Sequence, residues 1–112
     1  MKENEVRYVY LRRQHTSRNH GGVVTCAATL IDPNTLNVGF SFCSPKDEFV
    51  KKVGRNKAAG RMLSHHASTV PFHGNTYRDI VNFWNTPENG LERPQFCHNW
   101  MIESTTGEIF EN

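Results

Sequence analysis

The sequence of 112 residues lacks several features that define common protein classes. It has only three cysteines, an odd number with no CxxC pair, which argues against a disulfide scaffold and fits a reducing cytoplasm. No run approaches the roughly 20 apolar residues of a membrane span. The formal net charge is only +2, which by itself does not indicate a nucleic-acid-binding protein. The cysteines are Cys26, Cys43 and Cys97.

Known catalytic and phosphate-binding signatures are also missing. There is no Walker-type glycine-rich loop, no dinucleotide fingerprint and no paired carboxylate site. Adjacent residues such as His65–His66 and Cys97–His98 lack the spacing of zinc ligands, and neighbours on a strand point to opposite faces. The sequence therefore predicts no enzyme, no metal and no cofactor. The N-terminal segment has no apolar core, so we expect no signal peptide.

The length is that of one domain, spanning residues 1–112. Hydrophobic residues make up 37% of the chain, which predicts a thin core that oligomerisation would complete. Five segments are predicted to form strands, and the first of them alternates and is rich in Val and Tyr, as is typical of a strand. The turn Asp32–Thr35 joins the second and third, because its proline presets φ. The predicted strands are Glu5–Leu11, Val23–Ile31, Leu36–Cys43, Gln95–Ile102 and Glu108–Phe110.

Residues 44–64 are predicted to form the longer of two helices. Ser44 is suited to cap it, Pro45 suits its first position, and Asp47 completes an S-x-x-D capping box. At ~100° per residue, one stripe of side chains is expected to pack on the sheet. That stripe contains Phe49, Val53, Asn56, Gly60 and Leu63.

A similar capping box predicts a shorter helix over Thr76–Trp84, with Ile80, Phe83 and Trp84 on its apolar side. The order of elements predicts an α+β fold. Its antiparallel sheet of four or five strands is packed by one long and one short helix.

Four cations of the longer helix are candidate ligand residues. Lys51 and Arg55 lie one turn apart on one face, and Lys57 and Arg61 lie on another. A glycine precedes each arginine and costs about 1 kcal/mol in a helix, which suggests close approach of a partner or ligand. Two interpretations stay open: a solvated basic face, or an anion site built from both arginines and the neighbouring lysines.

Aromatic residues in the second half form either ordinary core or a platform for a nucleobase. Phe83 and Trp84 are the candidates for stacking. A basic loop in the first half is either solvated or folds over an anionic ligand. The aromatic set is Tyr77, Phe83, Trp84, Phe96 and Trp100, and the loop set is Arg12, Arg13, His15, Arg18 and His20.

Residues 39–61, a block of 23 of the 112 residues, contain the pattern FCSPKDxFxKKxGRxxAxGR. This block resembles a recurring block in small proteins of tailed bacteriophages. Phage proteins of this size often resemble counter-defence factors, and the Thoeris anti-defence sponges are similar in broad layout. The resemblance implies an oligomer that sequesters a cyclic nucleotide signal in the host cytoplasm. It also implies phosphate contacts from Arg55 and Arg61, and a base stacked on Phe83 or Trp84.

Three functions are consistent with the sequence. The first is a non-enzymatic phage counter-defence protein that binds a small anionic nucleotide and assembles as a homo-oligomer. The second is an inhibitor that blocks a host nuclease or CRISPR effector, using an acidic tail or an aromatic surface. The third is a weak nucleic-acid binder whose affinity falls steeply with salt. The acidic tail contains Glu103, Glu108 and Glu111.

Overall fold

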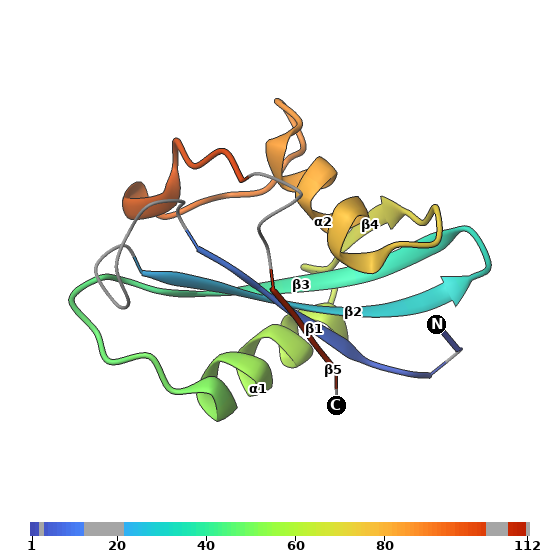
Figure 1. Ribbon diagram of the computed structural model, residues 1–112, viewed down its shortest axis with the longest axis horizontal. Helices are drawn as coiled ribbons and strands as arrows, with labels where there is room; N and C mark the ends of the chain where they lie inside the picture. The colour runs from blue at the N-terminus through green and yellow to red at the C-terminus, as the bar shows by residue number, and fades with distance from the viewer. Residues whose placement is uncertain (3, 13–21, 103–107, 112) are drawn as a thin grey trace.

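The computed structural model describes residues 1–2, 4–12, 22–102 and 108–111. They form a five-stranded antiparallel sheet with the order β4-β3-β2-β1-β5, together with two α-helices (Figure 1). The predicted α+β class is confirmed. The elements are β1 Arg7–Leu11, β2 Val23–Asp32, β3 Thr35–Cys43, α1 Lys51–Met62, β4 Ser68–Pro71, α2 Thr76–Asn85, a 3₁₀ turn η1 Gln95–Cys97, and β5 Glu108–Glu111.

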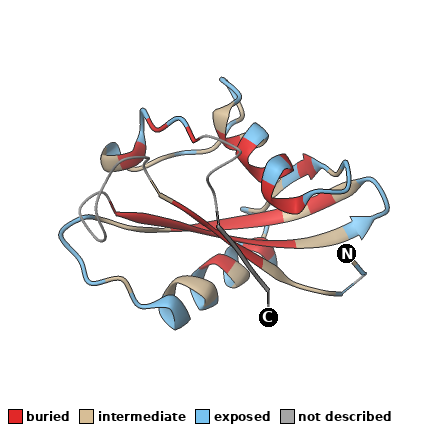
Figure 2. Cartoon of the chain, viewed as in Figure 1, coloured by how far each residue is buried: buried red, intermediate tan, exposed pale blue. Residues whose placement is uncertain are grey.

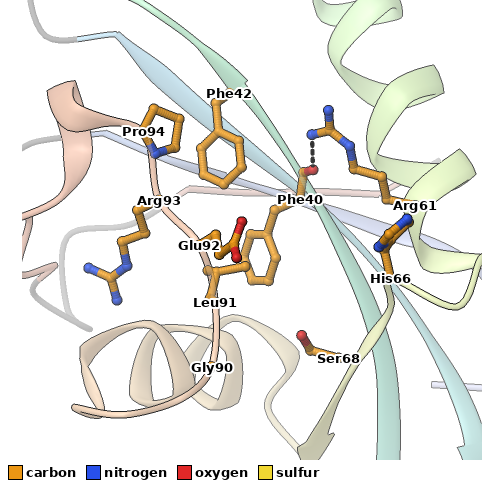
Figure 3. A pocket seen from close by; sticks show the side chains of 10 residues that line it. All are labelled: Phe40, Phe42, Arg61, His66, Ser68, Gly90, Leu91, Glu92, Arg93 and Pro94. Carbon is orange, nitrogen blue, oxygen red and sulfur yellow. Dashed lines mark hydrogen bonds between the residues drawn. The ribbon is translucent and has the colours of Figure 1, made fainter.

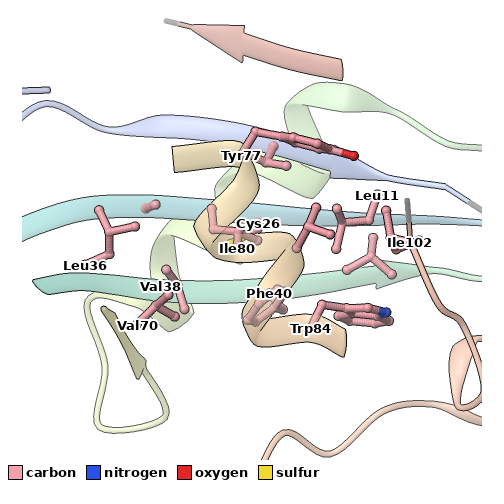
Figure 4. Packing of buried hydrophobic residues seen from close by; sticks show 14 of the residues in the cluster. Leu11, Cys26, Leu36, Val38, Phe40, Val70, Tyr77, Ile80, Trp84 and Ile102 are labelled. Atoms are coloured by element: carbon pink, nitrogen blue, oxygen red, sulfur yellow. The ribbon is translucent and has the colours of Figure 1, made fainter. Parts of the chain in front are cut away.

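The two helices cover opposite faces of the sheet, with α1 beneath it and α2 above it in Figure 1. Because successive side chains of a strand alternate in direction, each face has its own core. The α2 face holds the larger cluster, which includes Leu11, Phe40, Ile80 and Trp84 (Figure 4). The α1 face holds a smaller one: Tyr8, Tyr10, Val23, Ala27, Ala58 and Met62. Buried residues are concentrated in the central strands (Figure 2).

Helix α1 begins at Lys51, so the predicted start at Ser44 is wrong. The Ser44 carbonyl accepts from the Asp47 N–H at 3.1 Å, and this bond closes a turn. The same Ser-Pro-x-Asp pattern suits a β-turn with proline at its second position, which explains the error. The cap residue of α1 is Val50, which makes no side-chain capping bond.

Of the predicted packing stripe, Phe49 packs against the α1-side cluster, but the members within and after α1 do not face the sheet as predicted. Val53 is 48% exposed and Leu63 is 79% exposed, whereas Ala58 and Met62 are buried. The helix packs through its backbone against Gly39 of β3, where a Cβ atom would collide with backbone atoms of residues 58, 61 and 62. Small residues, rather than the largest apolar ones, therefore decide which side of α1 faces the sheet.

The fourth strand lies elsewhere than predicted. Residues 95–102 contain the short turn η1 and then irregular chain, with Trp100 packed into the core. Strand β4, Ser68–Pro71, is instead paired with Thr35–Val38 of β3. Its four residues include a proline, too short and irregular a pattern to indicate a strand. The edge strand predicted at Glu108–Phe110 is confirmed as β5, paired with β1.

Helix α2 forms over Thr76–Asn85, which confirms the predicted shorter helix. Its cap is Asn75, one residue before the predicted capping position, and the Asn75 Oδ1 accepts from the Arg78 N–H at 3.0 Å. Across the described ranges of the chain, neither helix is long and apolar enough to cross a membrane.

Candidate ligand groove at the free edge of strand β3

Strand β3 is longer than the strand that borders it. It pairs with β2 along its length, but with β4 only through Thr35–Val38. Within the described chain, residues 39–43 therefore have no strand partner on the β4 side. An edge of this kind presents backbone donors and acceptors to whatever lies beside it.

A groove of about 740 Å³ lies along this free edge (Figure 3). Its volume is within the range of about 300–1,000 Å³ that is usual for small-molecule sites. Aromatic side chains of β3 form its floor, the end of α1 and the chain that follows form one wall, and the segment after α2 forms the other. The lining residues are Phe40, Phe42, Arg61, His66, Ser68, Gly90, Leu91, Glu92, Arg93 and Pro94.

Arg61 carries the positive charge of the α1 wall. It lies in the last turn of α1, and its Nη1 donates to the Phe40 carbonyl at 2.5 Å (Figure 3). This bond holds the guanidinium at the groove. Its other N–H groups have no partner among the described residues, and an arginine has five such donors in a planar fork. The group is therefore placed to bind a phosphate or carboxylate.

His66 extends the same wall. Its backbone N–H donates to the Ser64 Oγ at 3.0 Å, and the Ser64 Oγ in turn donates to the Arg61 carbonyl at 2.8 Å. The His66 ring lies beside Arg61 in Figure 3, and its centroid is 4.1 Å from that of His65. The turn after α1 thus presents an imidazole next to the guanidinium.

The opposite wall is fixed by the end of α2. The Asn89 Nδ2 donates to the Phe83 carbonyl at 2.8 Å, and the Asn89 Oδ1 accepts from the Leu91 N–H at 2.8 Å. Gly90, with φ +79°, makes the turn that these bonds require. These hydrogen bonds therefore hold the segment after α2 against the end of that helix.

Arg93 belongs to this wall only by its backbone and stem. Its guanidinium lies 3.8 Å from the centroid of the Trp84 ring and donates to the carbonyls of Trp84 and Trp100. Burial lowers the pKa of this guanidinium below its ordinary value. In Figure 3 the side chain points away from Arg61, so Arg93 serves the core and not the groove.

The structure separates the six predicted ligand residues. Arg61 alone lines the groove. Arg55 is held on the α1 face, where its Nε donates to the Tyr10 hydroxyl at 2.5 Å and its guanidinium lies 5.4 Å from the Tyr8 ring. Lys51 lies 5.3 Å from the Tyr10 ring. Arg55 and Lys51 therefore join α1 to β1.

The other three predicted residues lie in separate places. Lys57 lines a distinct cavity of about 320 Å³ that also includes Asp47 and Glu48. Phe83 stacks on Phe40, with centroids 6.1 Å apart. Trp84 has no exposed surface and so has no face available to a ligand. Both aromatics lie on the sheet face opposite α1, because α2 packs there.

Phe42 is the groove residue that the sequence-based prediction missed as a stacking partner. It is half-buried, whereas Phe40 beside it is 3% exposed. Its position in the alternating strand and its place in the phage-like block were available as signals. Neither signal shows that β3 extends past β4, and it is this extension that leaves Phe42 uncovered by a neighbouring strand.

Most residues of the basic loop and of the acidic tail lie outside the part of the chain that the structure describes. Arg12 is described, and its guanidinium lies 5.6 Å from the centroid of the Phe49 ring. The rest of the loop, residues 13–20, and Glu103 lie outside the described residues, as do the side chains of β5.

Neither a metal cluster nor an activated thiol is evident in the described part of the chain. It contains no group of three or more His, Cys, Asp or Glu side chains that could hold a metal ion. Burial raises the pKa of each thiol, to about 11 for Cys97, and Asp47 also raises the pKa of Cys43. Thiols of this kind stay protonated at neutral pH and are poor nucleophiles.

Comparison with protein-family models, with curated proteins and with solved structures finds no match for this chain.

Proposed function

We propose that the protein binds a small nucleotide in the groove at the free edge of β3 and sequesters it without catalysis. One observation carries this proposal: the Arg61 guanidinium, bonded to the Phe40 carbonyl, lies in the same groove as the aromatic side chains of β3. Arg61, with His66 beside it, supplies the contacts for a phosphate. Phe42 supplies an apolar ring on which a base stacks.

The groove is suited to a compact ligand rather than to a polymer. Arg61 and His66 are concentrated at one wall, while Lys51 and Arg55 lie on the other face of the sheet from Phe42. A nucleic-acid backbone needs a row of cations along its path. A mononucleotide or cyclic dinucleotide needs one phosphate site beside one ring.

The biological setting that we propose follows from the phage-like block in residues 39–61. A phage protein that holds a nucleotide immune signal in the host cytoplasm lowers the free concentration of that signal. Sequestration needs tight binding and no chemistry. Two subunits that share one ligand would strengthen the binding, so a homo-oligomer belongs to the same proposal.

Calorimetric titration of the purified protein with mononucleotides, cyclic dinucleotides and cyclic ADP-ribose isomers tests the binding. We expect at least one to bind, Arg61→Gln to weaken it by about tenfold or more, and Lys57→Gln to leave it unchanged. Lys57→Gln is the matched control, because it removes the same charge from the same helix. Absence of heat with every ligand contradicts the proposal.

A second experiment tests sequestration. After incubation, the protein is denatured and the released nucleotide is identified by mass spectrometry, while native mass spectrometry of the intact complex gives its subunit number. We expect the nucleotide to be recovered unchanged. A hydrolysed or transferred product would show catalysis and overturn this part of the proposal.

The free edge of β3 also supports a second candidate function, inhibition of a host enzyme by direct binding. Among the described residues, 39–43 have no strand partner on one side, where only the Phe40 carbonyl is bonded, to Arg61. An extended segment of a partner adds to such an edge by backbone hydrogen bonds. Affinity purification from host lysate separates the two. A stoichiometric host protein with no bound nucleotide supports inhibition, and a bound nucleotide with no protein supports sequestration.

A further inference from the structure

Glu92 is the acidic residue of a groove whose other wall is basic. It lines the groove together with Arg61, and in Figure 3 its side chain lies on the wall across from Arg61. No described side chain forms an ion pair or hydrogen bond with it. The neighbouring cation, Arg93, is committed to the carbonyls of Trp84 and Trp100. The two walls of the groove therefore carry opposite charges.

An ionised carboxylate accepts hydrogen bonds and donates none. It repels a phosphate, so the phosphate of a bound nucleotide belongs at Arg61 and the rest of the ligand extends toward Glu92. The group that meets Glu92 must present hydrogen-bond donors. A pair of adjacent donors is the best match, because two carboxylate oxygens accept them side by side.

The nucleobases differ in the donors that they present along one edge. Guanine has N1–H and the 2-amino group next to each other, both donors. Adenine has a single amino group next to a ring-nitrogen acceptor, and uracil has one N–H between two carbonyl oxygens. A ribose also offers adjacent donors through its 2′- and 3′-hydroxyls. Phe42, which is half-buried, lines the same groove as Glu92 and offers aromatic surface there, which favours the base.

We propose that Glu92 makes the groove selective for guanine nucleotides by accepting hydrogen bonds from N1–H and the 2-amino group. This inference rests on the proposed function, because it identifies the ligand of the same groove. The phosphate is held at Arg61, the guanine lies against Phe42, and its donor edge meets the Glu92 carboxylate.

The test is a calorimetric comparison of four ligands on the wild-type protein: GMP, IMP, AMP and 2′,3′-dideoxy-GMP. IMP lacks only the 2-amino group, and the dideoxy compound lacks only the ribose hydroxyls. We expect GMP to bind about tenfold or more tightly than AMP, with IMP between them. The dideoxy compound should bind as GMP does. Weak binding of the dideoxy compound would show that Glu92 contacts the ribose, and would overturn the assignment to guanine.

The variant Glu92→Gln separates selectivity from binding. A glutamine side chain accepts through one oxygen only, so the preference for GMP over AMP should disappear while AMP binding is retained. Glu88→Gln is the matched control, since it removes the same charge from the same segment outside the groove. Both positions are exposed, and circular dichroism confirms the fold of each variant.

The outcomes distinguish this inference from the proposed function. If the wild-type protein binds nucleotides with no preference among bases, the role of Glu92 is overturned and the function stands. The same holds if Glu92→Gln weakens GMP and AMP equally. If no nucleotide of any base binds the wild-type protein, both proposals fall.

Discussion

The two faces of the sheet are closed by helices of different kinds. Helix α2 has a side-chain cap at Asn75 and buries Ile80 and Trp84 completely. Helix α1 has no side-chain cap, and only Ala58 and Met62 of its residues are buried. The α2 face is thus held by apolar burial. The α1 face is held by close backbone approach and by polar contacts from its arginines.

This difference explains why two similar arginines have different surroundings. Arg55 and Arg61 each follow a glycine on α1, yet Arg55 is bonded to the Tyr10 hydroxyl inside the interface with the sheet. Arg61 lies at the end of the helix, past the last residue of β3 that β4 covers, and faces the groove. We therefore propose that Arg55 stabilises the fold and that Arg61 binds the ligand.

The largest effect that we expect comes from the α2 face. Trp84→Ala removes a fully buried ring, together with its hydrogen bond to the Trp100 carbonyl. The free energy of unfolding should fall by about 3–5 kcal/mol. Leu63→Ala, at an exposed site on α1, should change it by about 0.5 kcal/mol or less. Urea unfolding measures both, and equal losses would contradict the contrast between the faces.

The next largest effect concerns two glycines of the α1 face. Gly39→Ala places a methyl group against the backbone of α1 and should destabilise the protein by about 1–3 kcal/mol. A Cβ atom at Gly60 meets nothing within 4 Å. Gly60→Ala should therefore stabilise the protein by up to about 1 kcal/mol. Thermal unfolding that moves in the same direction for both variants would show that α1 packs differently.

A smaller effect tests the role of Arg55. Tyr10→Phe and Arg55→Gln each remove the bond between these residues, and each should cost about 1–2 kcal/mol. The double variant should cost clearly less than the two single losses added together, because they share one interaction. Unfolding of all three variants measures this coupling. Additive losses would mean that the two side chains do not interact.

The smallest effect distinguishes the two helix starts. Asn75→Ala removes a capping bond to the Arg78 N–H and should cost about 1 kcal/mol. Ser44→Ala lies in the turn before α1 and caps no helix, so its cost should stay below about 0.5 kcal/mol. A larger loss at Ser44 than at Asn75 would restore the helix start predicted from the sequence.

The same contrast shows what the sequence could predict. Helix α2 depends on local patterns, namely polar residues at its start and apolar periodicity along it. The hairpin of β2 and β3 depends on a proline turn. Both elements were predicted. The start of α1 was not, because its Ser-Pro-x-Asp pattern suits a β-turn as well as a helix start. The packing face of α1 was not, because it depends on contact between the backbone of residues 58–62 and Gly39, which is distant in sequence. Strand β4 was missed since four residues carry too little periodicity.

The candidate site was predictable only in part. The residues proposed from the sequence include Arg61, which lines the groove, but Arg55 had equal weight because both follow a glycine on the same helix. Size and aromaticity suggested Trp84, which the core covers completely, instead of Phe42. Which aromatic ring lies beside which cation depends on the length of β4 relative to β3, and no local pattern encodes that length.

The location of bound nucleotide is the central claim, and backbone amide NMR during titration with GMP tests it most directly. The predicted result is a set of shift changes centred on Phe42, Arg61, His66 and Glu92. The amides of Tyr10 should not change. Changes centred on β1 and the first turn of α1, or no changes at millimolar GMP, would contradict the assignment of the site to the free edge of β3.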